Sequence, residues 1–307
     1  FIYEPSPVTV AIPAILIKKL KRIPVIFWVT DLWPESIIAT LRPSSLNKKI
    51  INGLINPIVK WIYNESDKIL VTSKGFVNSI REKIGKSKDI EFFPQWAESI
   101  FRPISNKNIS FLNEIPENSF KIMFAGNLGE AQDFPSIIKC ASLLKRHKNI
   151  QWIIIGDGRK KSWIESQIKI NNLQSCFHLL GSFPVEKMPQ FYSAADTLLF
   201  SLKDDFIFSI TIPAKVQSYL ACGKPIIGMV NGESQKLINN SKSGFCCHSG
   251  DFKNLSKKIL ELSKMNKIQI NELGKNALSL YKRSFDRNVI FNRAEEIFNE
   301  ITKLNNE

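Results

Sequence analysis

Six short apolar runs, each followed by a turn and a helix-like stretch, lie between Lys121 and His248 and constrain the fold more than any other feature. The runs are apolar throughout rather than alternating with polar residues, as in strands whose two faces are both covered. Such strands, alternating with helical patterns, are typical of a parallel sheet between two layers of helices. The six runs are KIMFAG (121–126), WIIIG (152–156), FHLLG (177–181), TLLFSL (197–202), PIIGMV (225–230) and GFCCH (244–248).

The first third of the chain repeats this alternation in reduced form, with strand-like runs at 23–31, 68–73 and 90–95. We therefore expect an α/β fold with two Rossmann-like, doubly wound domains. Two such domains in tandem would face each other across a cleft, and sheets of this kind bind their ligands at the carboxyl ends of the strands.

The expected domains are residues 1–108 and residues 119–285, with a linker in the polar stretch 105–119. A C-terminal helix at 286–307 has an apolar stripe and should pack back on the first domain. The chain begins at Phe1 rather than Met, and its first element is already in mid-pattern. We therefore expect the N-terminal domain to be truncated at its start.

The charge balance limits the class of partner. In a chain of 307 residues, 42 Lys and Arg outnumber 28 Asp and Glu, so the net charge is +14. A basic surface attracts nucleic acid, an anionic membrane or phosphorylated small molecules. The Lys residues are scattered and no nucleic-acid-reading motif is present, so we expect no nucleic-acid partner.

Metal and redox chemistry have few candidate residues. The five cysteines form no CxxC pair, and the three histidines show no metal-ligand spacing. We expect buried thiols and no bound metal. No apolar segment approaches the roughly 20 residues that span a bilayer.

Two stretches could hold a phosphate group. In the loop GNLGEAQDF, Gly126 and Gly129 let the backbone approach a ligand just before a helix, although the loop could also be a structural turn. In SITIPAKVQSYL, Thr211 precedes a helix that begins near Pro213, and Lys215 lies in its first turn. The alternative is that Thr211 only caps the helix and that Lys215 is solvated.

Further candidates follow the ends of other strands. Lys203 lies at the carboxyl end of TLLFSL, where α/β sheets place ligand-binding groups. The turns GDG (156–158) and 181–183 could shape a pocket for a flat base. In the first domain, Asp31 ends a strand and could hold a sugar hydroxyl or accept a proton, or it could be a helix N-cap.

These segments together resemble a known family. The loop AGNLGEAQDF, the turn IIIGDG, the segment GSFPVEKMPQFYSAAD and above all IPAKVQSYLACGKPII are similar to family-four retaining glycosyltransferases of the GT-B fold. With DLWPES, the chain is most similar to the branch that adds amino sugars such as N-acetylfucosamine during O-antigen and capsule assembly. The resemblance covers nearly the whole chain.

The resemblance implies a reaction. A sugar would pass from a UDP or GDP donor, held by the second domain, to a hydroxyl of a lipid-linked or glycan acceptor, held by the first, with its anomeric configuration kept and without a metal cofactor. The enzyme would be cytoplasmic and would bind the inner face of the cytoplasmic membrane peripherally. Asp31 would then hold the acceptor hydroxyl, and the nucleoside would contact Gly156, Asp157, Gly181 and Phe183.

The chain departs from the family at several positions. Asn127 and Gln132 stand where many members carry Arg and Lys, and Ile210 and Ser218 stand where many carry Glu. The family's first strand and glycine-rich loop are also missing, in agreement with a truncated start. The charge that binds the diphosphate must therefore come from elsewhere. The residues expected at the diphosphate are Gly126, Asn127, Gly129, Lys203, Thr211, Lys215 and Ser218.

A basic amphipathic stretch at 47–62, NKKIINGLINPIVKWI, could lie against an anionic membrane. It could equally be an ordinary helix that faces the core, and Pro57 interrupts it. Two further functions stay open: a noncatalytic protein that binds sugar nucleotides or a membrane, and a GT-B epimerase that acts on the sugar nucleotide. The small number of His residues counts against the epimerase.

Overall fold

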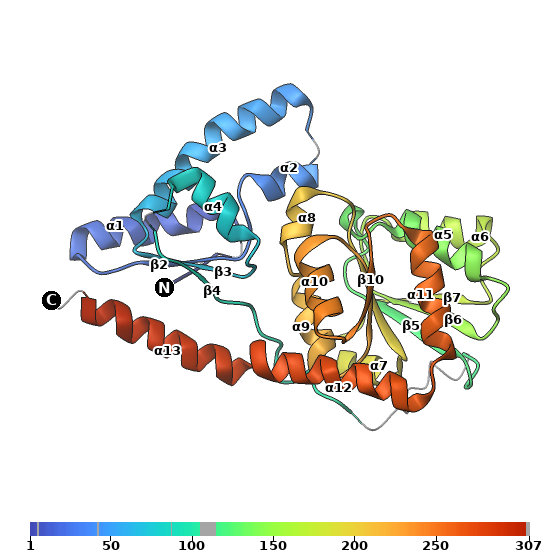
Figure 1. Cartoon of the computed structure of the whole chain (residues 1–307). Coiled ribbons are helices and arrows are strands. Elements are labelled where there is room, and N and C mark those ends of the chain that lie inside the picture. The colour runs from blue at the N-terminus through green and yellow to red at the C-terminus, as the bar shows by residue number, and fades with distance from the viewer. Residues whose placement is uncertain (5, 42, 87, 105–114, 305–307) are drawn as a thin grey trace. The chain divides into compact units, whose positions relative to one another are not determined.

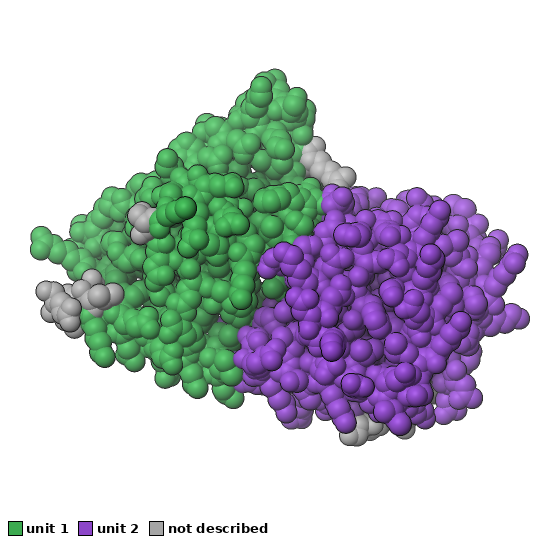
Figure 2. Space-filling model, viewed as in Figure 1, with its two compact units in different colours: residues 1–95, 205–212, 288–307 green, residues 96–204, 213–287 purple. Residues whose placement is uncertain are grey.

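The computed structural model describes residues 1–4, 6–41, 43–86, 88–104 and 115–304. The chain forms two compact units, shown in different colours in Figure 2. Unit 1 comprises Phe1–Gln95, Asp205–Ile212 and Asn288–Glu307, and unit 2 comprises Trp96–Asp204 and Pro213–Arg287. Most of the expected linker, 105–119, lies outside the described residues.

Unit 2 contains a six-stranded parallel sheet with the order β10-β9-β8-β5-β6-β7. All six apolar runs of the sequence form these strands. The order reverses next to β5, as in doubly wound sheets, whose ligands bind at this switch point. The strands are β5 (Phe120–Ala125), β6 (Ile150–Ile155), β7 (Phe177–Gly181), β8 (Thr197–Ser201), β9 (Ile226–Met229) and β10 (Gly244–Cys247).

Helices cover both faces of this sheet (Figure 1). One face packs against α5 (Phe134–Leu144), α6 (Lys161–Ile170) and α11 (Phe252–Lys264), around the buried rings of Trp152, Phe124 and Phe134. The other face carries α7 (Met188–Ala194) and α9 (Ala214–Ala221), and α12 (Lys267–Ser284) packs on α9. The unit also contains α10 (Gly232–Asn240) and the 3-10 turns Glu130–Gln132 and Val185–Lys187.

Unit 1 is a smaller parallel sheet with the order β1-β2-β3-β4. Its strands are β1 (Ile2–Glu4), β2 (Ile26–Val29), β3 (Lys68–Val71) and β4 (Ile90–Phe92). Its helices are α1 (Ala11–Lys21), α2 (Glu35–Leu41), α3 (Ser45–Glu65), α4 (Phe76–Ile84), α8 (Phe206–Ile210) and α13 (Arg287–Leu304), and a 3-10 turn spans Val8–Val10. Phe27 and Tyr63 pack in the core between the sheet and α1, α3 and α4.

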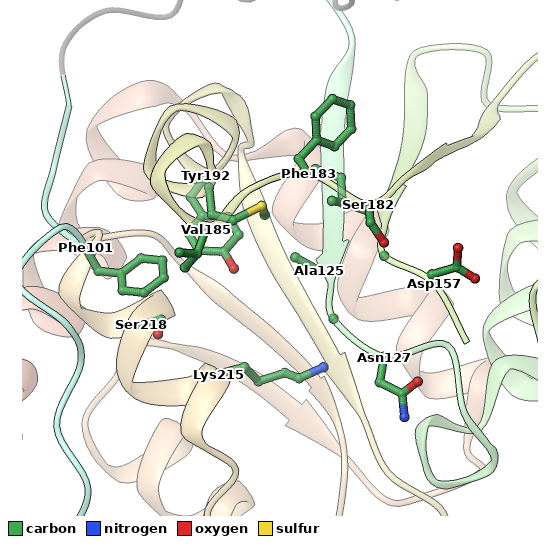
Figure 3. A pocket seen from close by; sticks show the side chains of 14 residues that line it. Phe101, Ala125, Asn127, Asp157, Ser182, Phe183, Val185, Tyr192, Lys215 and Ser218 are labelled. Carbon is green, nitrogen blue, oxygen red and sulfur yellow. The ribbon is translucent and has the colours of Figure 1, made fainter. Parts of the chain in front are cut away.

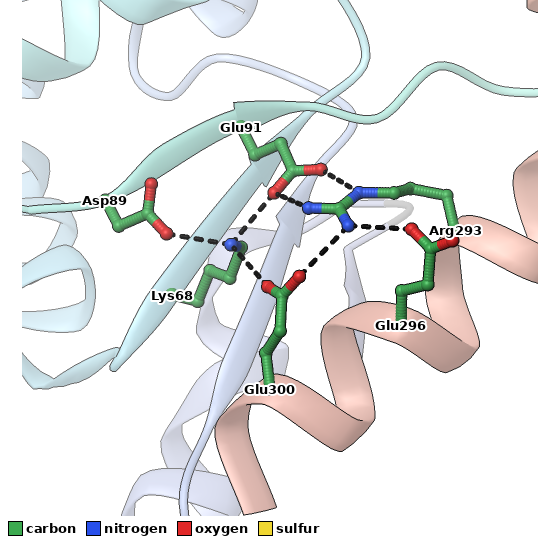
Figure 4. A network of polar contacts seen from close by, with 6 residues as sticks. All are labelled: Lys68, Asp89, Glu91, Arg293, Glu296 and Glu300. Carbon is green, nitrogen blue, oxygen red and sulfur yellow. Dashed lines mark hydrogen bonds and ion pairs between the residues drawn. The ribbon is translucent and has the colours of Figure 1, made fainter. Parts of the chain in front are cut away.

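A polar network attaches α13 to the edge strand β4 (Figure 4). The Arg293 guanidinium donates through Nε and NH2 to the two carboxylate oxygens of Glu91, at 2.6 and 2.8 Å. Lys68, which is 7% exposed, pairs with both Glu91 and Asp89. Burial alone would raise the pKa of Glu91, but the hydrogen bonds from Arg293 and Lys68 outweigh it and lower that pKa. The network joins the last helix to a sheet that is about 200 residues earlier in the chain.

Both units therefore have the predicted α/β architecture with parallel strands. The sequence interpretation missed β1, because a three-residue strand is too short to show a period. It also treated Pro57 as an interruption, whereas α3 continues through it as one helix. Residues 205–212, expected within the second domain, group with unit 1, where Ile207 joins the core.

Candidate functional site

A pocket of about 460 Å³ lies in unit 2 at the carboxyl ends of β5, β6 and β7 and beside α9 (Figure 3). This is the position at which the strand order reverses, so the fold itself places the pocket. Its lining comes from the strand-to-helix loops, from α7 and the first turns of α9, and from the segment that precedes β5. The lining residues are Phe101, Ala125, Gly126, Asn127, Ile155, Gly156, Asp157, Ser182, Phe183, Val185, Met188, Tyr192, Lys215 and Ser218.

Two glycines let the backbone form the floor of this pocket. Gly126 and Gly156 have φ values of 136° and 139°, which L side chains rarely adopt. A Cβ atom on Gly156 would lie 1.9 Å from the carbonyl oxygen of Gly126. The two turns can approach one another because Gly156 lacks a side chain, and the missing Cβ of Gly126 leaves room for the Lys215 ammonium.

Lys215 extends from the start of α9 across this floor (Figure 3). Its Nζ lies 4.2 Å from the centroid of the Phe124 ring and 2.8 Å from the position that a Cβ on Gly126 would occupy. Burial lowers the pKa of Lys215 to about 8. Within the described residues, no carboxylate forms an ion pair with this ammonium group. A bound anion would supply the missing charge.

An aromatic wall stands on the opposite side of the pocket from Asn127 and Asp157 (Figure 3). Phe101 and Tyr192 stack with their centroids 5.9 Å apart, and Tyr192 is 5% exposed. Phe183 packs against Phe191 at 4.6 Å. Such rings offer flat apolar surface to a planar ligand group, while the polar side of the pocket carries the Lys215 ammonium and the side chains of Asn127 and Asp157.

The pocket brings together seven of the residues that the sequence singled out as donor-binding candidates. Four come from the expected diphosphate set, namely Gly126, Asn127, Lys215 and Ser218, and three come from the expected nucleoside set, namely Gly156, Asp157 and Phe183.

The other four candidates lie outside the lining. Gly129 donates its N–H to Gln132 Oε1 at 3.1 Å, and the carbonyl of Gly181 accepts from the Gly156 N–H at 2.8 Å. The hydroxyl of Thr211 donates to the carbonyl of Ile207 at 2.7 Å, and both residues belong to unit 1.

Lys203 is engaged in an ion pair. Its Nζ lies 2.7 Å from Glu130, which also pairs with Lys160 at 2.5 Å. Hydrogen bonds from Lys160 and Lys203 lower the pKa of Glu130 to about 2. Lys203 is thus held by a carboxylate at the loop that follows β5, whereas the Lys215 ammonium has no such partner.

The sequence interpretation did not single out the aromatic wall. Tyr192 and Met188 lie in the GSFPVEKMPQFYSAAD segment, whose pattern is that of a helix and gives no sign of a ligand. Phe101 lies in an irregular stretch with no pattern at all. Apolar residues that line a pocket have the same sequence signature as core residues, so only the fold separates them.

Asp31 lies in unit 1, in the turn that follows β2. Its Oδ1 accepts a short hydrogen bond from the hydroxyl of Ser36, and its backbone N–H donates to Glu4 Oε2 at 3.3 Å. Burial raises the pKa of Asp31, and the Ser36 hydrogen bond opposes this effect. The residue as a whole is half-buried.

Neither a metal cluster nor a membrane span is found in the described parts of the chain. No group of three or more His, Cys, Asp or Glu side chains there is arranged to hold a metal ion. None of the described helices combines the length and the apolar character needed to cross a bilayer.

A comparison with protein families finds one match. Residues 105–279, which are 175 of the 307 residues, match the model described as glycosyl transferases group 1. The matched region contains the pocket except for Phe101.

Curated relatives point in the same direction. The chain is 26% identical over 247 residues to a probable glycosyltransferase of Pseudomonas aeruginosa, WbjE, which covers 78% of this chain and 59% of the relative. It is 26% identical over 162 residues to the putative colanic acid biosynthesis glycosyl transferase WcaI of Escherichia coli strain K12, over 51% of this chain and 39% of the relative. The chain therefore spans less than two thirds of the length of either relative.

Solved structures share the fold. HepE of Anabaena, in complex with UDP and glucose, superposes with a TM-score of 0.74 at 14% identity, over 95% of this chain and 75% of that one. Sucrose-phosphate synthase from Thermosynechococcus elongatus superposes with a TM-score of 0.73 at 16% identity, over 90% of this chain and 68% of that one. These likenesses confirm the predicted fold class, an α/β fold with two parallel-sheet domains.

Proposed function

The chain belongs to the group 1 glycosyl transferases, and from this premise we propose that it transfers a sugar from a nucleoside diphosphate donor to an acceptor hydroxyl in the synthesis of a cell-surface polysaccharide. The observation that carries the proposal is the pocket at the switch point of unit 2, in which the Lys215 ammonium has no acidic partner among the described residues.

The pocket divides into regions that suit the parts of such a donor. The flat base would lie against the aromatic wall of Phe101, Tyr192 and Phe183. The diphosphate would lie between Lys215 and the amino end of α9, where the helix dipole favours negative charge. The Gly126 and Gly156 turns would let the phosphates approach the backbone closely. Because the charge on the diphosphate increases as the sugar leaves, a pre-aimed ammonium stabilises the transition state more than the ground state.

We further propose a retaining reaction on an N-acetylated amino sugar, with UDP or GDP as the leaving group and a lipid-linked or glycan acceptor. In a front-face reaction, the acceptor oxygen bonds to the anomeric carbon as the carbon–phosphate-oxygen bond breaks, and the leaving diphosphate takes the acceptor proton. Asp31 would accept a hydrogen bond from the acceptor hydroxyl and keep it oriented. The proposal includes no metal ion, so an excess of EDTA should leave the rate unchanged.

The proposed location is the cytoplasmic face of an anionic membrane. On α3, Leu46, Ile50, Leu54 and Ile58 follow one another at helical spacing and are 66, 50, 68 and 40% exposed. Lys48, Lys49 and Lys60 on the same helix are also exposed and complement anionic lipid. The opposite face of α3 packs against the core, where it buries Val59, Ile62 and Tyr63.

Donor binding and turnover are tested separately. Calorimetric titration of the protein with UDP and with GDP should reveal binding to one of them, and release of nucleoside diphosphate from candidate donors should require an acceptor. Binding without turnover would favour the noncatalytic alternative, and a changed sugar configuration on the intact donor would identify an epimerase. No binding of either nucleotide would overturn the proposal.

Membrane binding is tested by sedimentation with phosphatidylglycerol-rich vesicles. The Leu54→Ser variant should lose most of the bound fraction, whereas Leu143→Ser, the same change at a 52% exposed position on α5 of unit 2, should retain it. Equal binding by the two variants would remove α3 from the membrane proposal.

A further inference from the structure

Unit 1 contains a buried polar cluster where β1, β2 and β3 end. Glu4 is the last residue of β1, Asp31 lies just after β2, and Ser73 lies just after β3. Tyr63 reaches the cluster from α3, and Glu35 reaches it from the first residue of α2. Glu4, Tyr63 and Ser73 are each 0% exposed. The carboxyl ends of parallel strands are where α/β sheets place reactive groups.

Several polar atoms in this region have no hydrogen-bond partner among the described residues. Leaving a buried polar group unpaired costs roughly 1–3 kcal/mol, and proteins generally avoid it. Unpaired groups at a strand terminus are therefore expected to meet water or a ligand. The atoms are Glu4 Oε1, Trp33 Nε1, Glu35 Oε2, Tyr63 OH and Ser73 Oγ.

The second oxygen of Glu4 holds the turn that carries Asp31. Glu4 Oε2 accepts from the backbone N–H groups of Thr30 and Asp31, each at 3.3 Å. The hydroxyl of Thr30 donates in turn to the carbonyl of Glu4. Two chain segments that are about 26 residues apart are thereby fixed to each other directly at Asp31. This contact fixes the backbone at Asp31, and the Ser36 hydroxyl donates to the Asp31 carboxylate.

Burial, together with a neighbouring negative charge, makes the ionisation of Glu4 unfavourable. Burial, to which the nearby Asp31 charge adds, raises the pKa of Glu4 to about 8. The charged neighbours that face the cluster are Asp31 and Glu35. The nearby cation, Lys83, pairs with Glu35 and not with Glu4. No ion pair joins Glu4 to a cation within the described residues. The raised pKa favours the protonated form of Glu4 at neutral pH.

We propose that Glu4 is a positioning residue for Asp31: its Oε2 accepts hydrogen bonds from the backbone N–H groups of Thr30 and Asp31, and it thereby presents the Asp31 carboxylate to the acceptor hydroxyl. The role of Asp31 in this proposal rests on the proposed function. The contact between Glu4 and Asp31 and the order in which the two carboxyl groups ionise are independent of the proposed function.

The test compares Glu4→Gln with the wild-type protein. An amide has the shape of a neutral carboxyl group, and its oxygen can accept the same two N–H bonds. The side-chain carboxyl groups are labelled with 13C in Asp and Glu and followed by NMR from pH 4 to 10, and the Asp31→Asn variant assigns the Asp31 signal. Glu4 should titrate near pH 8, and the Asp31 signal should show a second step at the same pH. Glu4→Gln should abolish that second step and leave the first unchanged.

Transfer activity provides the second measurement. At pH 6.5, Glu4→Gln should keep the wild-type rate within about threefold, whereas Glu4→Leu, which cannot accept the N–H bonds, should lose about 100-fold, as expected when a group that orients the substrate is displaced. Above pH 8, the wild-type rate should change as Glu4 ionises, and the rate of Glu4→Gln should not. Glu82→Gln, on the exposed face of α4, is the matched control and should behave as wild type in both measurements.

Three results would overturn the inference. These are a Glu4 signal that titrates in the ordinary range near pH 4.5, an Asp31 signal that has no step near pH 8, and a Glu4→Gln variant that is as slow as Glu4→Leu at pH 6.5. If the wild-type protein transfers no sugar from any donor, the proposed function fails, and the NMR titration still decides whether Glu4 and Asp31 are coupled. If Glu4→Leu does not fold, the comparison of Glu4→Gln with wild type decides alone.

Discussion

Replacing Lys215 by Met should stabilise the protein and weaken nucleotide binding at the same time. The pKa of Lys215 falls from 10.5 to about 8 on folding, because burial disfavours its charged form. A difference of one pKa unit corresponds to about 1.4 kcal/mol, so the charged ammonium costs about 3 kcal/mol of stability at pH 7. The Nζ faces a pocket that water can enter, which makes this value an upper bound.

The sign of the effect depends on pH. At pH 7 the ammonium is charged in both the folded and the unfolded chain, and the full cost is present. Between pH 8 and 10.5 the folded protein has lost this proton and the unfolded chain has not, so the stability of the wild type rises with pH. The advantage of Lys215→Met should therefore be about 2–3 kcal/mol at pH 7 and should disappear near pH 10.5.

Nucleotide affinity should change in the opposite direction. A hydrogen bond to a charged group contributes about 1.5–3 kcal/mol, so Lys215→Met should bind UDP or GDP about 10-fold to 100-fold more weakly. Urea unfolding followed by tryptophan fluorescence gives the stability at pH 7 and pH 10.5, and calorimetry gives the affinity. Lys253→Met, on an exposed position of α11, is the control and should change neither quantity.

If Lys215→Met unfolds at the same urea concentration as wild type at pH 7, the buried charge carries no cost and the expected stabilisation is refuted. If the variant binds the nucleotide as tightly as wild type, the ammonium does not face the phosphates and the expected loss of affinity is refuted.

Other substitutions test single contacts. Arg293→Met should destabilise unit 1 by about 1–2 kcal/mol in low salt and by less in 0.5 M NaCl, as measured by urea unfolding, because it leaves Glu91 with only its lysine partner. Because the pKa of Glu4 is raised on folding, the folded protein keeps a proton that the unfolded chain loses between pH 4.5 and 8, and the wild type should lose about 1.4 kcal/mol of stability per pH unit over this range. Glu4→Gln cannot ionise and should not show this loss. Gly156→Ala should lower the melting temperature and abolish nucleotide binding, because its Cβ would overlap the carbonyl of Gly126.

Long apolar runs predicted the fold of unit 2 well. KIMFAG and WIIIG became β5 and β6 because strands that are buried on both faces must be apolar at every position. The three-residue strand β1 gave no such signal, and it is held by its parallel pairing with β2, which lies more than 20 residues later. Pairing between distant segments leaves no trace in a short stretch of sequence.

Some parts of the site could be predicted from the sequence and others could not. Positions that require glycine or proline are visible in the sequence, so the Gly126 and Gly156 turns and the helix start at Pro213 could be predicted. The sequence does not show which partner a charged side chain will have. Lys203 and Lys215 both follow β8 in the sequence, yet one forms an ion pair with Glu130 and the other lies against the Phe124 ring with no acidic partner among the described residues. Only the packed structure distinguishes the two.

Each unit contains a buried titratable group that affects both stability and the proposed function. Lys215 in unit 2 and Glu4 in unit 1 are both titratable groups held at the carboxyl end of a parallel sheet, without an ion-pair partner among the described residues. Each costs stability in its charged form, and neither cost is offset by a neighbouring countercharge. The two costs act over separate pH ranges and with opposite signs, since Glu4 lowers stability as the pH rises to 8 and Lys215 raises it above 8. We therefore expect the free energy of unfolding of the wild type to pass through a minimum near pH 8. Glu4→Gln should flatten the acid side of this profile, and Lys215→Met should flatten the alkaline side.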